Sequence, residues 1–168
     1  VLTPQDPLTA LDDLAQQIAD SGIKEINGDV IIDARLFDEF VVPNNERLIS
    51  PMIVNENLID VTIIPTEPGQ PAMVDWRPKS AAFDINANVM TAGEGDELDI
   101  ELSKPDSSCF ELLECVGVVT GQIPAGFKPD LPEVETLVQT FKIEGPSAYA
   151  RTAFIEALQR AGVTVNTN

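Results

Sequence analysis

Apolar residues near the start of the chain recur at the spacing of one helix face. Asp6 and Pro7 form a start signal, because an acidic N-cap followed by proline is typical of a helix N-terminus. Gly22 supplies the stop, since glycine readily takes the left-handed conformation just beyond a helix. The pattern predicts an amphipathic helix over residues 7–21, with an apolar face made by Leu8, Leu11, Leu14, Ala15 and Ile18.

Two strands are expected in the stretch after this helix. Residues 29–33 form a short apolar run between turn-prone residues, which is typical of a strand buried on both faces beneath covering helices. Residues 52–65 contain a second strand, because Ile59, Val61 and Ile63 alternate with polar positions. Residues 34–51 between them are predicted to be irregular.

The pattern changes between residues 66 and 137, where glycines, prolines and acids punctuate short alternating segments. Residues 97–102 alternate as a strand with one solvated face, and residues 110–119 are predicted to form another strand. Residues 122–133 contain Pro124, Pro129 and Pro132, which favour an extended connection. This section therefore predicts a small, mostly β subdomain.

A second helix is predicted near the end of the chain. Pro146 opens it and Gly162 ends it. Residues 137–143 before the helix and 163–165 after it are strand candidates. The apolar stripe of this helix consists of Ala150, Ala153, Phe154, Ala157, Leu158 and Ala161.

Together these elements predict an α/β plus all-β fold. Helices and strands from both chain ends, residues 1–65 and 138–168, would form one small α/β unit. The β-rich subdomain of residues 66–137 would be inserted into that unit.

Charge narrows the possible partners. The 168 residues carry a net charge of −18, with a pI of about 4.1. Such a chain repels phosphate backbones and anionic lipid, so we expect neither nucleic acid nor a membrane surface as partner. No apolar run approaches the roughly 20 residues of a membrane-spanning helix. A solvated acidic surface is the simplest explanation, and cationic partners remain compatible with it.

The residues available for metal and redox chemistry are few. The chain has no histidine and two cysteines, Cys109 and Cys115. Two cysteines alone cannot build a zinc site, so the sequence predicts no metal and no cofactor. A disulfide would require a tight turn at Leu112 and Leu113, since bridged Cα atoms lie within about 7 Å. The alternative is a pair of half-buried packing cysteines.

Ser21 and Lys24 match the S-x-x-K spacing of penicillin-binding serine enzymes. In those enzymes the serine opens a helix and the lysine lies one turn later, within reach of the hydroxyl. Here the helix is predicted to end between the two residues, at Gly22, and its C-terminal dipole disfavours an alkoxide. Neither S-D-N nor K-T-G occurs in the sequence. We interpret the match as accidental, and the sequence offers no catalytic residue.

Paired carboxylates could support glycoside hydrolysis, but the candidates are poorly placed. Asp29 and Asp33 flank one predicted strand and would emerge at its opposite ends. Glu97, Asp99 and Glu101 share one strand face, for which solvation is a sufficient explanation. Residues 94–101 lack the spacing of a calcium loop.

Two further features have both a structural and a functional interpretation. The polar cluster Asn55-Glu56-Asn57 interrupts an apolar stretch, and its amides either tie the loop backbone together or mark a contact surface; we favour the tie. Trp76, the single tryptophan, either covers the middle subdomain or forms a ligand platform, and we favour the cover.

Four stretches, taken in order, resemble one known family. They are GIKEINGDVIID at 22–33 with Leu36-Phe37-Asp38, SPMIVNEN at 50–57 with Asp60-Val61-Thr62, GQPA at 69–72, and residues 146–163. They are similar to stretches of D-alanyl-D-alanine carboxypeptidases of the class C low-molecular-mass penicillin-binding proteins, peptidase family S13. Residues 73–137 match only loosely.

The resemblance implies that this chain is the insertion which splits a transpeptidase-like catalytic domain in that family. An α/β and a mostly β accessory domain form the insertion, and the catalytic S-x-x-K, S-x-N and K-T-G motifs lie outside it. None of the family's catalytic residues matches a position here. The chain also opens on Val1 rather than Met, which fits a processed or excised piece.

The expected function is that of a non-catalytic accessory region of a serine-type D-Ala-D-Ala carboxypeptidase or endopeptidase acting on peptidoglycan without a metal. Its expected partner is the catalytic domain of the same parent chain, with peptidoglycan as a further candidate. A periplasmic or extracellular location, associated with the cell envelope, is implied by the resemblance. The alternative is a free-standing acidic binding module of the bacterial cell envelope.

Overall fold

The structure is a computed structural model that describes residues 2–43, 47–104, 109, 115–129 and 136–167. Its helices are α1 (Thr9–Asp20) and α3 (Pro146–Arg160), with a short 3-10 turn η1 (Asn55–Asn57). The strands are β1 (Glu25–Asn27), β2 (Phe40–Val42), β3 (Arg47–Ile49), β4 (Leu58–Ile64), β5 (Met73–Arg77), β6 (Phe83–Ala92), β7 (Asp99–Ser103), β8 (Cys115–Pro124), β9 (Leu137–Lys142) and β10 (Thr164–Asn166).

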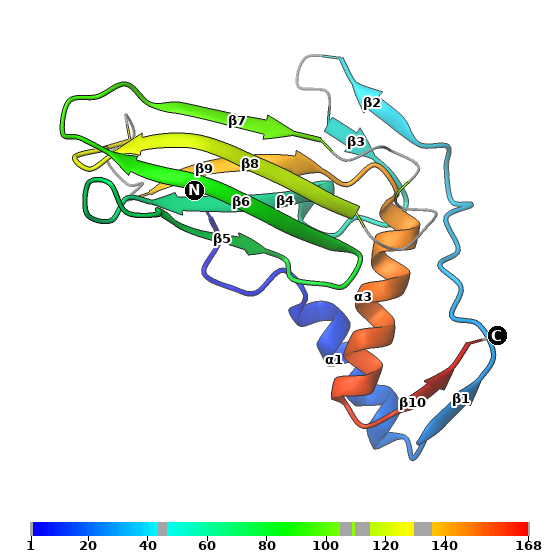
Figure 1. The fold of residues 1–168 in the computed structure, drawn as a ribbon. Helices are drawn as coiled ribbons and strands as arrows, with labels where there is room; N and C mark the ends of the chain where they lie inside the picture. The colour runs from blue at the N-terminus through cyan, green and yellow to red at the C-terminus, as the bar shows by residue number, and fades with distance from the viewer. Residues whose placement is uncertain (1, 44–46, 105–108, 110–114, 130–135, 168) are drawn as a thin grey trace.

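The strands form two larger and two smaller sheets. One three-stranded sheet has the order β5-β4-β9 and is antiparallel, and the other has the order β6-β8-β7, in which β6 and β8 are parallel. The smaller sheets pair β2 with β3 and, in parallel, β1 with β10. Figure 1 shows the two larger sheets together at one end of α1 and α3, with β1 and β10 at the other end.

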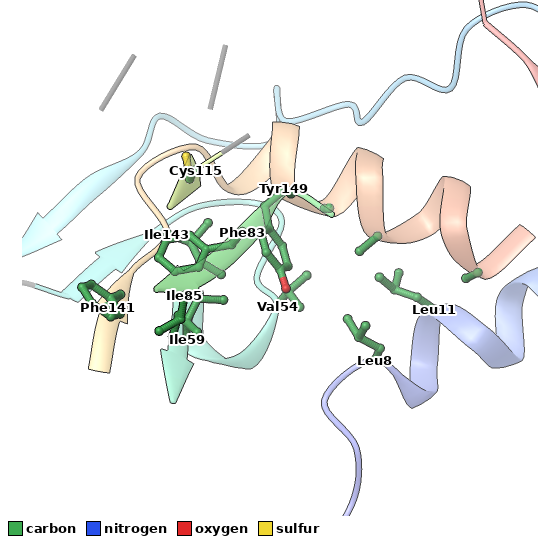
Figure 2. Packing of buried hydrophobic residues seen from close by; sticks show 14 of the residues in the cluster. Leu8, Leu11, Val54, Ile59, Phe83, Ile85, Cys115, Phe141, Ile143 and Tyr149 are labelled. Atoms are coloured by element: carbon green, nitrogen blue, oxygen red, sulfur yellow. The ribbon is translucent and has the colours of Figure 1, made fainter. Parts of the chain in front are cut away.

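Among the described residues, one apolar cluster joins the sheets to the helices. The rings of Phe83 on β6 and Phe141 on β9 lie 5.6 Å apart, so the two larger sheets pack face to face. Tyr149 on α3 is fully buried and donates a hydrogen bond from its hydroxyl to the carbonyl oxygen of Pro78 at 3.2 Å. Figure 2 shows Leu8 and Leu11 on the α1 side of this core and Phe141 on the sheet side.

The two predicted helices are confirmed, with changed bounds. Helix α1 begins two residues later than predicted, because the Asp6 carboxylate accepts the N–H of Leu8 at 2.8 Å and holds a turn before the helix. Gly22 takes a φ of 93°, as a helix stop requires. Leu14 is the wrong member of the predicted apolar face, since it is exposed while Ala19 is buried.

The predicted strand at residues 29–33 is wrong. The strand comes earlier, at Glu25–Asn27, and pairs with Thr164–Asn166. Within the described part of the chain, residues 29–33 have no strand partner, and Ile31 is 81% exposed rather than buried on both faces. An apolar run forms a buried strand only where a neighbouring strand and a covering layer are present. Residues 34–51, predicted to be irregular, contain the β2–β3 hairpin.

The other strand predictions are largely confirmed. Residues 137–143 contain β9, residues 163–165 overlap β10, and the alternating run in 52–65 is β4, with Ile59, Val61 and Ile63 fully buried. Residues 97–102 overlap β7. Strand β8 continues to Pro124, further than predicted, while residues 110–114 and 130–133 lie outside the described residues.

The architecture is a mixed α/β fold with a mostly β part, as predicted from sequence. The division into residues 1–65 with 138–168 and residues 66–137 stays a prediction. One sheet crosses the predicted boundary near residue 65, because β4 and β5 are paired. Their antiparallel register runs from Ile64 opposite Met73 to Asp60 opposite Arg77. Among the described residues, no helix is long and apolar enough to cross a membrane.

Candidate functional site

In the S-x-x-K match, Ser21 and Lys24 each contact a carbonyl oxygen at the end of α1. Ser21 is the C-cap of α1, and its hydroxyl donates to the carbonyl oxygen of Ile18 at 2.7 Å. The Lys24 ammonium lies 3.5 Å from the carbonyl oxygen of Ala19, at the same helix end. Both side chains therefore interact with carbonyl oxygens at the negative end of the helix dipole, where an alkoxide is disfavoured.

Asp29 and Asp33, which were considered as a catalytic carboxylate pair, each interact with a different arginine. Asp33 forms an exposed bidentate pair with Arg35, whose hydrogen bonds lower the pKa of this carboxyl group. Asp29 instead lies 3.6 Å from the guanidinium of Arg151 on α3. In the described ranges, no group of three or more acidic, histidine or cysteine side chains could hold a metal ion.

The two cysteines form a bridge. Cys109 and Cys115 are joined by a disulfide with a Cα–Cα distance of 5.0 Å, so the alternative of two free packing cysteines is wrong. Cys115 is buried at the start of β8, which anchors the bridge in the core. The turn predicted at Leu112-Leu113 lies outside the described residues.

The cluster Asn55-Glu56-Asn57 is a left-handed turn with three positive φ angles, 47°, 56° and 58°. Asn57 is buried, and its amide donates to the carbonyl oxygen of Leu48 and to the hydroxyl of Ser50, both at 3.0 Å. Its backbone carbonyl oxygen accepts the N–H of Ile143 at 2.8 Å. The favoured interpretation, a structural tie, is confirmed for Asn57, which joins three segments of the chain.

An extended segment, residues 28–42, exposes several large apolar side chains, and we call this segment the arm. It runs from β1 beside α3 to β2, as the light-blue trace of Figure 1 shows. Ile31 and Leu36 are 81% and 83% exposed, and the arm also exposes Phe37, Phe40 and Val41. Arg151 fastens the arm to α3 by donating from Nε to the carbonyl oxygen of Val30 at 2.9 Å.

Trp76 packs against the core and also borders a cleft. It lies on β5 opposite Val61 and packs against the core, which confirms the covering role. It also borders a cleft of about 860 Å³. The Lys79 ammonium lies 4.1 Å from the centre of its ring and 2.7 Å from the Asp75 carboxylate, which lowers the pKa of Asp75.

Sequence reasoning missed another residue that lines this cleft, Glu156 of α3. Its Oε1 accepts the N–H of Ala81 at 2.9 Å, and its Oε2 is buried without a hydrogen-bond partner among the described residues. Glu156 lies beside the apolar stripe of α3 without interrupting it, so periodicity alone carried no signal for it.

Comparison with known proteins finds relatives among carboxypeptidases and penicillin-binding proteins. A D-alanyl-D-alanine carboxypeptidase of Actinomadura sp. (strain R39) is 28% identical over 175 residues, covering 92% of this chain and 29% of the relative. Penicillin binding protein 4 of Haemophilus influenzae shares the fold at 16% identity, with a TM-score of 0.66 over 98% of this chain and 36% of that protein. Its complex with a β-lactam gives a TM-score of 0.62 over 34% of that chain.

This chain thus spans about a third of the length of the relatives it matches. The model of the D-Ala-D-Ala carboxypeptidase 3 (S13) family matches it from residue 1 to residue 168. The match agrees with the resemblance found in the sequence stretches at both chain ends. The chain therefore belongs to the D-Ala-D-Ala carboxypeptidase 3 (S13) family.

Proposed function

We propose that this chain is a non-catalytic accessory region of a longer serine-type D-Ala-D-Ala carboxypeptidase or endopeptidase that acts on peptidoglycan. The relatives support this proposal, because the region they share with this chain is 29–36% of their length. The sequence supports it as well, since S-D-N and K-T-G are missing and the one S-x-x-K is divided by a helix end.

The observation that carries the proposal is the arm. Large apolar side chains that gather on the surface of a soluble protein mark a contact with a partner, because exposing them to water is unfavourable. Ile31 and Leu36 are the two most exposed large apolar residues in the described part of the chain. We assign the arm as the surface that the catalytic part of the same protein covers.

The proposed location is the periplasm or the extracellular space. Peptidoglycan lies there, and the relatives are a carboxypeptidase and a penicillin-binding protein. The disulfide between Cys109 and Cys115 fits the same assignment, because disulfides persist in oxidising compartments and are rare in the cytosol.

Acylation by a fluorescent penicillin tests the catalytic side of the proposal. This chain should remain unlabelled, while the longer natural gene product should be labelled at a serine outside it. Labelling at Ser21 would overturn the proposal. A natural gene product without flanking S-x-x-K, S-x-N and K-T-G motifs would instead favour a free-standing acidic binding module.

A matched pair of leucine substitutions tests the arm. Leu36→Gln and Leu14→Gln both replace an exposed leucine, but only Leu36 lies on the arm. In this chain alone, each should change the free energy of unfolding by less than about 0.5 kcal/mol, as is usual for surface positions.

In the longer gene product, Leu36→Gln should lower the thermal midpoint and speed proteolysis near the arm, whereas Leu14→Gln should do neither. Equal effects of the two substitutions would exclude the arm as the contact surface. That result would not test the accessory role, which the labelling experiment tests separately.

A further inference from the structure

A cleft of about 860 Å³ lies between the end of β5, the start of β6 and the C-terminal half of α3. Its lining includes Trp76, Lys79, Phe83, Asp84 and Glu156. The complete lining comes from three separate parts of the chain, 76–84, 115–116 and 156–160, which the fold brings together. The lining residues all lie outside the arm, so a ligand site in the cleft is independent of the role proposed for the arm.

Two polar atoms of the cleft residues lack hydrogen-bond partners. Within the described residues, Nε1 of Trp76 and Oε2 of Glu156 are both shielded from solvent and unpaired. Buried polar groups are nearly always hydrogen-bonded, because leaving one unpaired loses its hydration without compensation. One of these atoms is a donor and the other an acceptor, so a ligand that satisfies both must offer one acceptor and one donor.

The Glu156 carboxylate is held in place for such an interaction. Its Oε1 accepts the N–H of Ala81 at 2.9 Å, which restrains the group and leaves Oε2 as its unpaired oxygen. Trp76 packs against the core from β5, where its backbone pairs with that of Val61. Both atoms are almost inaccessible to solvent, so a ligand reaches them only when the side chains around them shift.

The charges around the cleft favour a cationic donor. The two cations that line it are already paired, Lys79 with Asp75 at 2.7 Å and Arg160 with Asp12 at 2.6 Å. The two acids that line it, Glu156 and Asp84, have no ion pair with any residue that the structure describes. This leaves a local excess of negative charge, in a chain whose net charge is −18.

We propose that this cleft binds a peptide segment that carries a primary ammonium group. The ammonium donates to Oε2 of Glu156, and a nearby peptide carbonyl oxygen accepts the indole N–H of Trp76. The methylene stem of the ammonium-bearing side chain packs against Phe83 and Val116 in the apolar part of the wall. A peptide fits because it presents carbonyl acceptors close to such a side chain, whereas a simple amine would leave Trp76 unpaired.

The indole resonance of Trp76 provides a direct measurement, because the chain contains a single tryptophan. In ¹⁵N-labelled chain the one indole N–H peak should move downfield, in a saturable manner, as acetyl-Ala-Lys-Ala-amide is added. The same peptide with its lysine acetylated should bind at least about tenfold more weakly, because the charge-assisted hydrogen bond to Glu156 is lost.

Glu156→Gln tests the acceptor. The glutamine can keep the bond from the Ala81 N–H while removing the charge, and binding of the lysine peptide should weaken by about tenfold or more. Glu101→Gln makes the same charge change on the exposed face of β7 and should leave binding unaltered. Circular dichroism of both variants checks that they fold.

Three results would overturn the proposal: no saturable shift of the indole peak, equal binding of the lysine peptide and its acetylated counterpart, or unchanged binding by Glu156→Gln. The comparison between the two peptides uses the unaltered chain. It therefore decides the question even if Glu156→Gln fails to fold.

Discussion

The ring of Phe141 on β9 occupies the space in which a side chain at Gly117 on β8 would lie. A Cβ placed at Gly117 would meet ring atoms of Phe141 at 2.8 Å and 2.9 Å, closer than van der Waals contact allows. Gly117 therefore lets the two larger sheets approach each other at the point where Phe83 and Phe141 also meet. The face-to-face packing depends on the absence of a side chain at this one position.

Gly117→Ala should accordingly destabilise the chain by about 1–3 kcal/mol, the usual range for overpacking a well-packed core. Urea unfolding measures the change. Gly126→Ala is the matched control, because its Cβ would meet only the exposed side chain of Glu94, at 3.3 Å. If the two variants unfold at the same urea concentration, the ring of Phe141 has room to move.

The disulfide should contribute to stability mainly by restricting the unfolded chain. For a sequence separation of 6 between Cys109 and Cys115, the chain-entropy relation gives about 2 kcal/mol. We expect reductant to lower the urea midpoint of the natural chain and to leave that of the double variant Cys109→Ala/Cys115→Ala unchanged. A midpoint insensitive to reductant would show that the bridge is absent in solution or adds no stability.

Asn57 should be the most sensitive member of the left-handed turn. Asn57→Ala removes the side-chain hydrogen bonds to the carbonyl oxygen of Leu48, the hydroxyl of Ser50 and the N–H of Val54. A loss of about 2–4 kcal/mol is expected from the missing bonds together with buried backbone groups that lose a partner. Asn88→Ala, at an exposed position on β6, is the control and should be nearly neutral. Comparable losses in both would indicate that the tie contributes little.

The single tyrosine should titrate above its ordinary range. Burial raises the pKa of Tyr149, and the nearby charges of Glu156 and Asp6 raise it further. Because the folded pKa exceeds the unfolded pKa, stability is complete below about pH 10 and falls as the pH rises beyond it. Phenolate absorbance, followed in the folded and urea-unfolded chain, measures both midpoints. Coincident midpoints would contradict the burial of the hydroxyl.

Local pattern was sufficient to predict the parts of the fold that carry their own periodicity. The alternation of Ile59, Val61 and Ile63 predicts β4, and the signals at Pro146 and Gly162 predict α3. The prediction of a buried strand at residues 29–33 was wrong, because the burial of a strand depends on the elements that pack around it. No local signal shows that β1 would form earlier, or that the apolar run would lie in the exposed arm.

The cleft could not be predicted from sequence for a related reason. Trp76, Cys115 and Glu156 lie far apart along the chain, and each fits the apolar or helical pattern of its own segment. The sequence singled out Trp76 only because it is the one tryptophan, and it gave no indication of the Glu156 carboxylate. The Asn55-Glu56-Asn57 cluster was recognisable, by contrast, because polar residues there interrupt an apolar run.

Tyr149, the only tyrosine of the chain, donates a hydrogen bond to the carbonyl oxygen of Pro78. Pro78 lies two positions after Trp76, the only tryptophan. The molecule thus carries an intrinsic donor–acceptor pair for resonance energy transfer, with one chromophore on α3 and the other on β5. Tryptophan emission on tyrosine excitation would report how closely α3 remains docked on the sheet. Any event that loosens this contact can be followed without an added label.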